Sequence, residues 1–323
     1  MKSILSYLFA KYQKQQIRTD GGVGEEATAT DSWRQSPLIQ SFPFWGPPFI
    51  LMGFFVYGAL TWNFALSLTE FTGFGDPDYS NLGVQNYVTM LQDPTFWEAT
   101  WHTVILLVVF TIACLVIGLA LAILLDREIR YGNVFRTIYL LPFALSFIVT
   151  AQFWRWMYSV NDGIVNQFVG LFGIGPYNWL GDPSLVLGSV IFALVWQFSG
   201  YTMIIYLAAM RSIPRDHYEA ARVDGATTLR MYRRVIIPQL KPAMVSASVV
   251  LMLFSLKAFD FLYAVFDGYR PRQGADILAT MMMREGFNNS EWAYSSTIAL
   301  TLFVLSLAVI APYLYTEYKR GNL

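Results

Sequence analysis

Six long apolar stretches dominate this sequence, and each is long enough to cross a lipid bilayer. A transmembrane helix needs about 20 mainly apolar residues. Hydrophobic residues make up 55% of the 323 residues and charged residues only 14%, whereas soluble domains carry roughly 25% charged residues. We therefore expect an all-α integral membrane protein with six transmembrane helices, near 45–68, 102–125, 134–158, 185–210, 242–264 and 294–315.

The chain divides into a polar tail, residues 1–41, and a transmembrane domain, residues 42–323. The tail is partly flexible by composition, although Ile4–Tyr12 has the pattern of a short amphipathic helix at the membrane surface. Pro47 and Pro48 are expected in the first turn of the first span, where a missing N–H costs nothing. Pro142 lies inside the third span and predicts a kink there.

Lys and Arg are distributed unevenly between the loops. The loops 69–101 and 159–184 contain neither residue, whereas 126–133, the loop 211–241 and both ends of the chain are basic. Cytoplasmic loops carry the excess of Lys and Arg. We therefore expect a multi-pass protein of the cell membrane with both termini and the 211–241 loop in the cytoplasm. The loop 265–293 fits less well, because it carries three arginines.

Several other function classes find little support in the sequence. The formal net charge is zero, so no nucleic-acid partner is indicated. One cysteine, Cys114, and two well-separated histidines, His102 and His217, make a metal site or a catalytic set implausible. No Walker A pattern occurs, so the chain is not expected to be an enzyme that hydrolyses ATP. The triplet beginning at Asn288 matches a glycosylation acceptor, but such triplets are common by chance.

The 211–241 loop is basic but has the pattern of a helix–turn–helix. Residues 215–223 form a predicted helix after Pro214, and Asp224-Gly225 is a turn signal. Thr227 or Thr228 caps a second helix to Ile237, which Pro238 and Pro242 end. On composition alone, an amphipathic loop lying on anionic lipid is an equally good interpretation.

The spacing within this loop resembles the coupling motif of ABC importer permeases. The matching residues are Glu219-Ala220-Ala221, Gly225 and, after nine residues, Val235-Ile236-Ile237-Pro238. In that family the two short helices dock into a cleft of a cytoplasmic ATPase subunit. The resemblance implies an ATPase-coupling site made by Glu219, Ala220, Ala221, Asp224, Gly225 and Pro238.

The resemblance continues over most of the chain, from about residue 45 to the end. Residues 135–142, 154–166, 178–180 and 259–263 look like segments of the binding-protein-dependent sugar branch of these permeases, of the maltose type. That family implies a heterodimer with a second permease subunit, two copies of a cytoplasmic ATPase and an extracytoplasmic solute-binding protein. ATP and Mg²⁺ would be bound by the ATPase, so no cofactor is expected in this chain.

Two groups of residues are candidates for the substrate pathway. Aromatic rings stack on the apolar faces of sugars, and amides, hydroxyls and carboxylates bind their edges. Trp and Tyr are also common at lipid interfaces. Lys257 and Asp260 are predicted to share a helix face, either as a structural pair or with Asp260 facing a sugar cavity. The candidates are Trp196, Gln197, Tyr201, Phe259, Asp260 and Tyr263.

The resulting hypothesis is a permease subunit that forms half of the pathway of an ATP-driven sugar importer. One alternative keeps the class but changes the cargo to a polyol, a glycerol phosphodiester or an oligosaccharide. The other is a stand-alone secondary transporter or membrane scaffold. That alternative predicts inverted repeats or several carboxylates within the spans, and Asp260 is the single in-span carboxylate that we place.

Overall fold

The computed structural model describes residues 37–127, 130–271 and 274–319, and the described chain is helical without β-strands. The predicted helix at Ile4–Tyr12 lies outside these residues. The chain separates into two compact units, Met1–Thr61 and Trp62–Leu323, which are described individually. Four helices are long and apolar enough to span a membrane, or up to six if each of two bent helix pairs is one span.

The first span is a single helix, α2 (Pro37–Ser67), that begins earlier than the sequence predicts. Pro43, Pro47 and Pro48 therefore lie inside it, and the expectation that Pro47 and Pro48 occupy its first turn is wrong. Prolines are tolerated within transmembrane helices more readily than in soluble ones. Within its own unit, much of the apolar surface of α2 between Phe44 and Tyr57 is exposed.

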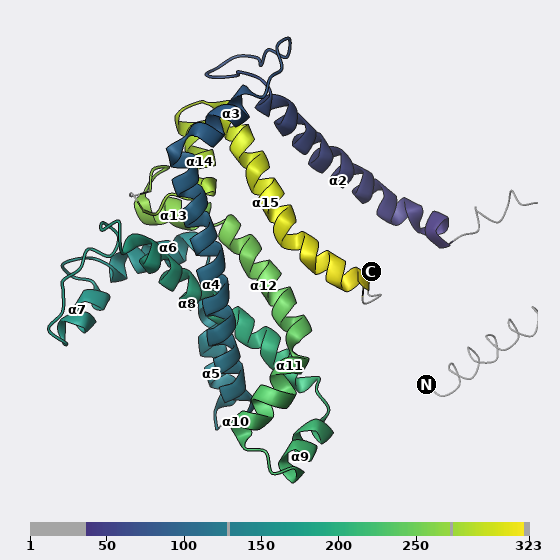
Figure 1. The fold of residues 1–323 in the computed structure, drawn as a ribbon, viewed down its shortest axis with the longest axis vertical. Helices are drawn as coiled ribbons and strands as arrows, with labels where there is room; N and C mark the ends of the chain where they lie inside the picture. The colour runs from purple at the N-terminus through teal and green to yellow at the C-terminus, as the bar shows by residue number, and fades with distance from the viewer. Residues whose placement is uncertain (1–36, 128–129, 272–273, 320–323) are drawn as a thin grey trace, which may run out of the picture. The chain divides into compact units, whose positions relative to one another are not determined.

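The second unit is built along α4 (Pro94–Asp126). This helix extends from α3 (Gln85–Gln92) and α14 (Leu278–Met283) at one end to α9 (Arg215–Val223) and α10 (Thr228–Met231) at the other (Figure 1). Asp93 caps α4 by accepting a hydrogen bond from the Thr95 backbone N–H at 2.8 Å. At 1.5 Å per residue, α4 is about 50 Å long, which exceeds the bilayer core of about 30 Å. The predicted span 102–125 is the C-terminal part of this helix.

The third span is broken instead of merely kinked. Helix α5 (Gly132–Leu140) leads into a 3₁₀ turn, η1 (Leu141–Ala144), and α6 (Phe147–Met157) leaves at a bend of 100°. Pro142 opens the 3₁₀ turn, and Ser146 caps α6 by accepting the Val149 N–H. The kink expected from Pro142 is thus a full break, because the chain at Leu145 is extended.

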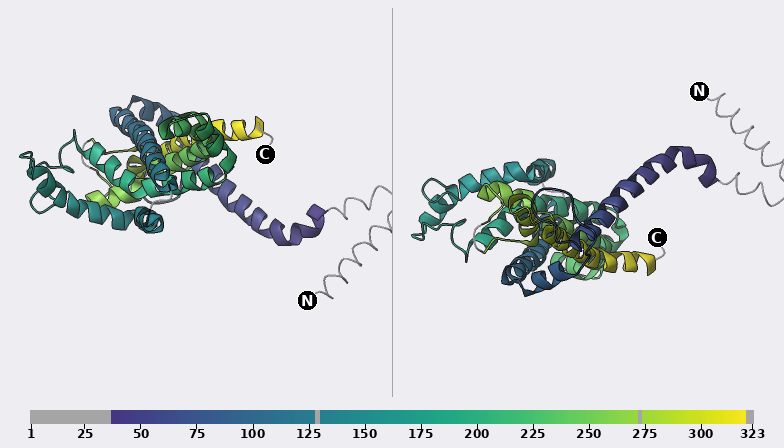
Figure 2. Two further views of the ribbon diagram at one scale, coloured as in Figure 1. Left: turned by 90° about the horizontal axis from the view of Figure 1, so that it is seen from below. Right: turned by 90° about the horizontal axis from the view of Figure 1, so that it is seen from above.

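Helix α8 (Val186–Arg211) packs most extensively against α4 and is mostly buried. The segment before it holds α7 (Ile164–Gly170), which lies at the periphery of the helix group in Figures 1 and 2. Buried Asn166 fixes this segment. Its amide donates to the Tyr177 carbonyl at 2.9 Å, and its oxygen accepts the Trp179 indole N–H at 2.8 Å.

The fifth span is also interrupted. Helix α12 (Lys241–Leu256) ends at Lys257, and α13 (Phe259–Phe266) follows after a two-residue break. Lys257 and Asp260 therefore do not share one face of a continuous helix, contrary to the expectation from their spacing. Both side chains are exposed and form no ion pair with each other.

The last elements are α14 (Leu278–Met283), a π-helical segment η3 (Arg284–Asn288) and α15 (Trp292–Lys319). Arg284 is buried and paired with Asp276 at 2.6 Å and Glu285 at 3.1 Å. One of the arginines that weakened the charge pattern in loop 265–293 is therefore a neutralised part of the interior.

Three buried clusters hold the second unit together. The largest joins α4, α6, α8 and α13 around Phe198 and Phe261, and a smaller one joins α3, α4, α14 and α15 around Phe96. The third lies between the ends of α4 and α8 and the 211–241 loop, around Met203 and Ile236. This last cluster positions the candidate coupling site.

Candidate functional site

The first half of the 211–241 loop is helix α9 (Arg215–Val223), the helix that the sequence predicts there. It ends because Gly225 adopts a left-handed backbone with φ of +72°, a conformation that glycine adopts without steric cost. The Ala226 N–H then bonds to the Ala221 carbonyl at 3.0 Å. This closed turn sets the direction of the second half of the loop.

The second half combines three short helical pieces, α10 (Thr228–Met231), the π-helical η2 (Tyr232–Ile236) and α11 (Ile237–Gln239). Thr227 caps α10 by accepting the Arg230 N–H. Pro238 lies within this helical run and does not end it, which corrects the prediction. Its ring would collide with a carbonyl of the preceding α-helical turn, and the π turn just before it avoids that collision.

The coupling residues lie on two faces of α9. Ala221 is buried in the third cluster with Met231 and Ile236, so this face holds the loop against α8. Glu219, Ala220, Asp224, Gly225 and Pro238 are exposed. The structure thus brings most of the predicted coupling residues to the surface and makes Ala221 their anchor.

Two exposed apolar side chains accompany them. Val223 is 88% exposed and Leu229 is 77% exposed, although the loop is otherwise polar at its surface. The sequence analysis did not identify Val223 and Leu229 as site residues. Apolar side chains within two short, mostly polar helices are the pattern that would have indicated them. Apolar side chains flanked by Glu219 and Asp224 form a surface suited to a partner protein.

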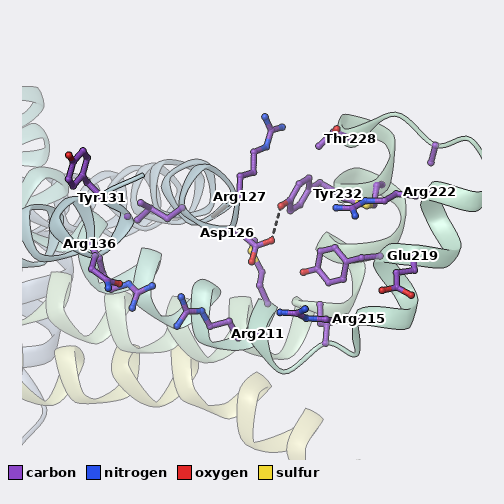
Figure 3. Close-up of a pocket in the computed structure, with 18 of the residues that line it drawn as sticks. Asp126, Arg127, Tyr131, Arg136, Arg211, Arg215, Glu219, Arg222, Thr228 and Tyr232 are labelled. Atoms are coloured by element: carbon purple, nitrogen blue, oxygen red, sulfur yellow. Dashed lines mark hydrogen bonds between the residues drawn. The ribbon is translucent and has the colours of Figure 1, made fainter. Parts of the chain in front are cut away.

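Asp126, at the end of α4, joins the loop to the transmembrane helices. The Tyr232 hydroxyl donates to its carboxylate at 2.7 Å (Figure 3). Burial and the nearby Asp126 charge raise the pKa of Tyr218 to about 12, and burial and the same carboxylate raise the pKa of Tyr232 further. Both phenols are therefore neutral donors at physiological pH. Sequence analysis missed this contact because its partners are 106 residues apart.

The candidate pathway residues on α8 differ in their surroundings. Trp196 stacks on Phe153 of α6 with ring centroids 5.7 Å apart, and Tyr201 stacks on Phe143 at 5.2 Å. Gln197 is only 2% exposed, and its amide donates to the Leu145 carbonyl at 2.8 Å. It therefore satisfies the backbone where the third span breaks, while its side-chain oxygen has no partner within the described chain.

The candidates on α13 form a second group. Phe259 contacts Tyr263 and stacks on Tyr269 with centroids 6.1 Å apart, and Asp260 is exposed beside them. Tyr269 was not predicted. Trp196, Tyr201 and Phe259 all border the largest buried cluster. These residues present aromatic faces and one carboxylate, the groups that bind sugars, and their role in the pathway stays a prediction.

Among the described residues, no group of three His, Cys, Asp or Glu side chains is arranged to hold a metal ion. The loop offers a surface outside the spans, and Asp126 and the third cluster connect that surface to α4 and α8.

Comparison with known proteins identifies the class. Residues 115–320 match the family described as "Binding-protein-dependent transport system inner membrane component". The chain belongs to this family of inner-membrane transport components. The stand-alone secondary transporter or scaffold is therefore set aside.

Individual relatives span nearly the whole chain. The xylose/arabinose import permease protein XacH of Haloferax volcanii is 54% identical over 305 residues, covering 94% of this chain and 96% of that protein. The trehalose/maltose transport system permease protein MalF of Thermococcus litoralis is 31% identical over 238 residues, covering 74% of this chain and 80% of that protein.

A solved structure shares the fold. The crystal structure of a bacterial ABC transporter involved in the import of the acidic polysaccharide alginate has a chain that matches with a TM-score of 0.75. The match covers 87% of this chain and 97% of that chain at 21% sequence identity. The described helices therefore share the fold of that transporter chain.

Proposed function

We propose that this chain is one of two permease subunits that together line the pathway of an ATP-driven sugar importer. The observation that carries the proposal is the 54% identity to a xylose/arabinose import permease over almost the entire length. A five-carbon sugar is therefore the proposed cargo. The aromatic groups around Trp196 and Phe259 suit the faces of such a sugar, and Gln197 and Asp260 suit its hydroxyls.

The partners follow from the family and from the coupling surface. We propose a second permease, two copies of a cytoplasmic ATPase and an extracytoplasmic solute-binding protein. The family description, with its dependence on a binding protein, supports the last of these. The exposed face with Glu219, Val223 and Leu229 supports an ATPase contact. The ATPase would bind ATP and Mg²⁺, so this chain is not itself an enzyme and needs no cofactor.

The proposed mechanism is alternating access driven through the loop. ATP binding would draw the ATPase copies together and displace α9. The contact of Asp126 with Tyr232, and the packing of Ala221 against the ends of α4 and α8, would pass that movement into the spans. The pathway would open outward, receive sugar and return inward after hydrolysis. Because the ATPase is cytoplasmic, the coupling loop would face the cytoplasm. Both termini would then lie on the same side, as the distribution of Lys and Arg indicates.

Gentle affinity purification of the chain from its native membrane tests the proposal. We expect an ATPase, a second six-span chain and a binding protein to co-purify. Mass spectrometry of ligands released from that binding protein should find a pentose. A disaccharide would overturn the cargo but keep the importer. Purification of the chain alone, across several mild detergents, would contradict the proposed assembly.

A further inference from the structure

A large pocket lies between the coupling loop and the ends of three transmembrane helices. Its volume is ≈ 1280 Å³. Its walls come from the end of α4, the start of α5, the end of α8 and the inner sides of α9 and α10 (Figure 3). Val223 and Leu229 of the coupling surface do not line it, whereas Glu219 borders both the surface and the pocket.

The pocket is strongly basic. Among the described residues, five guanidinium groups and two carboxylates, Asp126 and Glu219, line it, a formal excess of three positive charges. Asp126 already accepts the Tyr232 hydroxyl, and within the described residues none of the five arginines forms an ion pair. The arginines are Arg127, Arg136, Arg211, Arg215 and Arg222.

Arg136 and Arg211 are the most informative of these. Their side chains extend into the same part of the pocket (Figure 3). The Arg136 side chain is half-buried, and its Nε is enclosed and has no hydrogen-bond partner in the described chain. A buried charged donor without an acceptor is costly, and like charges that converge repel. An anion between them would remove both costs.

We propose that this pocket binds a phosphate-bearing anion, held chiefly by Arg136 and Arg211. Guanidinium forks match the oxygens of phosphate and bind them in pairs. The phosphate could be that of a lipid headgroup or of a soluble molecule, and the chemistry is shared. Because α4, α5, α8 and α9 all reach the pocket, a bound anion would tie the coupling loop to the spans.

Binding of inorganic phosphate to the purified full chain tests the proposal without any transport assay. The chain is placed in nanodiscs of phosphatidylcholine, and ³²P-labelled phosphate binding is measured by equilibrium dialysis at constant ionic strength. A parallel set of discs contains phosphatidylglycerol, and native mass spectrometry counts the anionic lipid that stays bound. The variants are Arg136→Gln and Arg211→Gln. Arg234→Gln is the control, because Arg234 is exposed on the same loop but outside the pocket.

A soluble ligand predicts saturable phosphate binding that weakens about tenfold in Arg136→Gln and Arg211→Gln and is unchanged in Arg234→Gln. A lipid ligand predicts no such binding, but retention of phosphatidylglycerol that the same two variants lose. Binding that is absent in both sets of discs, or equal in all four proteins, would overturn the proposal. Arg211 is exposed, so its variant keeps the test informative if Arg136→Gln does not fold.

Discussion

Asp126 shows how one side chain can connect a loop outside the spans to a helix inside them. Its carboxylate accepts the Tyr232 hydroxyl from the coupling loop, and Tyr218 lies close enough for the same charge to affect it. A hydrogen bond to a charged group contributes about 1.5–3 kcal/mol. Loss of this bond should therefore loosen the loop without disturbing the spans themselves.

Removing the Tyr232 hydroxyl should destabilise the chain measurably. We expect Tyr232→Phe to lower the free energy of unfolding by about 1–3 kcal/mol, because Asp126 keeps its charge and loses one of its two donors. Denaturant unfolding in detergent measures this. In combination with Asp126→Asn, the cost should be less than the sum of the single costs. Tyr79→Phe, in an exposed loop, is the control, and an equal stability of Tyr232→Phe and wild type would refute the contact.

Among the elements, α8 is in close contact with both α5 and α4, and each contact involves a glycine. A Cβ at Gly200 would overlap the Tyr139 carbonyl of α5, and a Cβ at Gly118 of α4 would overlap Thr202 of α8. The Thr202 hydroxyl in turn donates to the Cys114 carbonyl at 2.8 Å. Small residues allow transmembrane helices to approach closely, so these contacts determine how α4, α5 and α8 pack.

Adding one methyl group to α8 should therefore change the stability of the chain differently at two glycines. Gly200→Ala forces α5 away and should destabilise the chain by about 1–3 kcal/mol. Gly188→Ala is the matched control in the same helix, because nothing lies within 4 Å of its Cβ position, and it should be neutral or stabilising. Thermal unfolding in one detergent compares them. Equal midpoints for the two variants would contradict the close packing.

The elements also show what could be predicted from the sequence. Apolar length is a local property, so most of the span positions follow from it, and α9 and its Gly225 turn follow from local turn signals. The full break at Leu145 does not follow from local signals, because it involves a distant partner. Gln197, 52 residues from Leu145, supplies the hydrogen bond that the extended backbone needs. Likewise, nothing local to Tyr232 indicates Asp126.

In the whole molecule, burial differs greatly from span to span. Most of α8 is buried, whereas most of α15 is not. The second unit therefore leaves a wide apolar surface on α15, which agrees with the proposed role as one half of a pathway. Within the part of the chain that the structure describes, Asp126 is a charged connection between the coupling loop and the spans. In the proposed mechanism, movement of the ATPase reaches the spans through this loop.

The most direct test measures sugar uptake and ATP hydrolysis together in proteoliposomes that hold the complete importer. We predict that Glu219→Lys abolishes ATP-driven uptake and uncouples it from hydrolysis, while membrane insertion is normal. Asp216→Lys is the matched control, because Asp216 is exposed on the same helix but outside the predicted motif, and it should keep uptake within about twofold. Normal, ATP-coupled uptake by Glu219→Lys would contradict a coupling role for this loop.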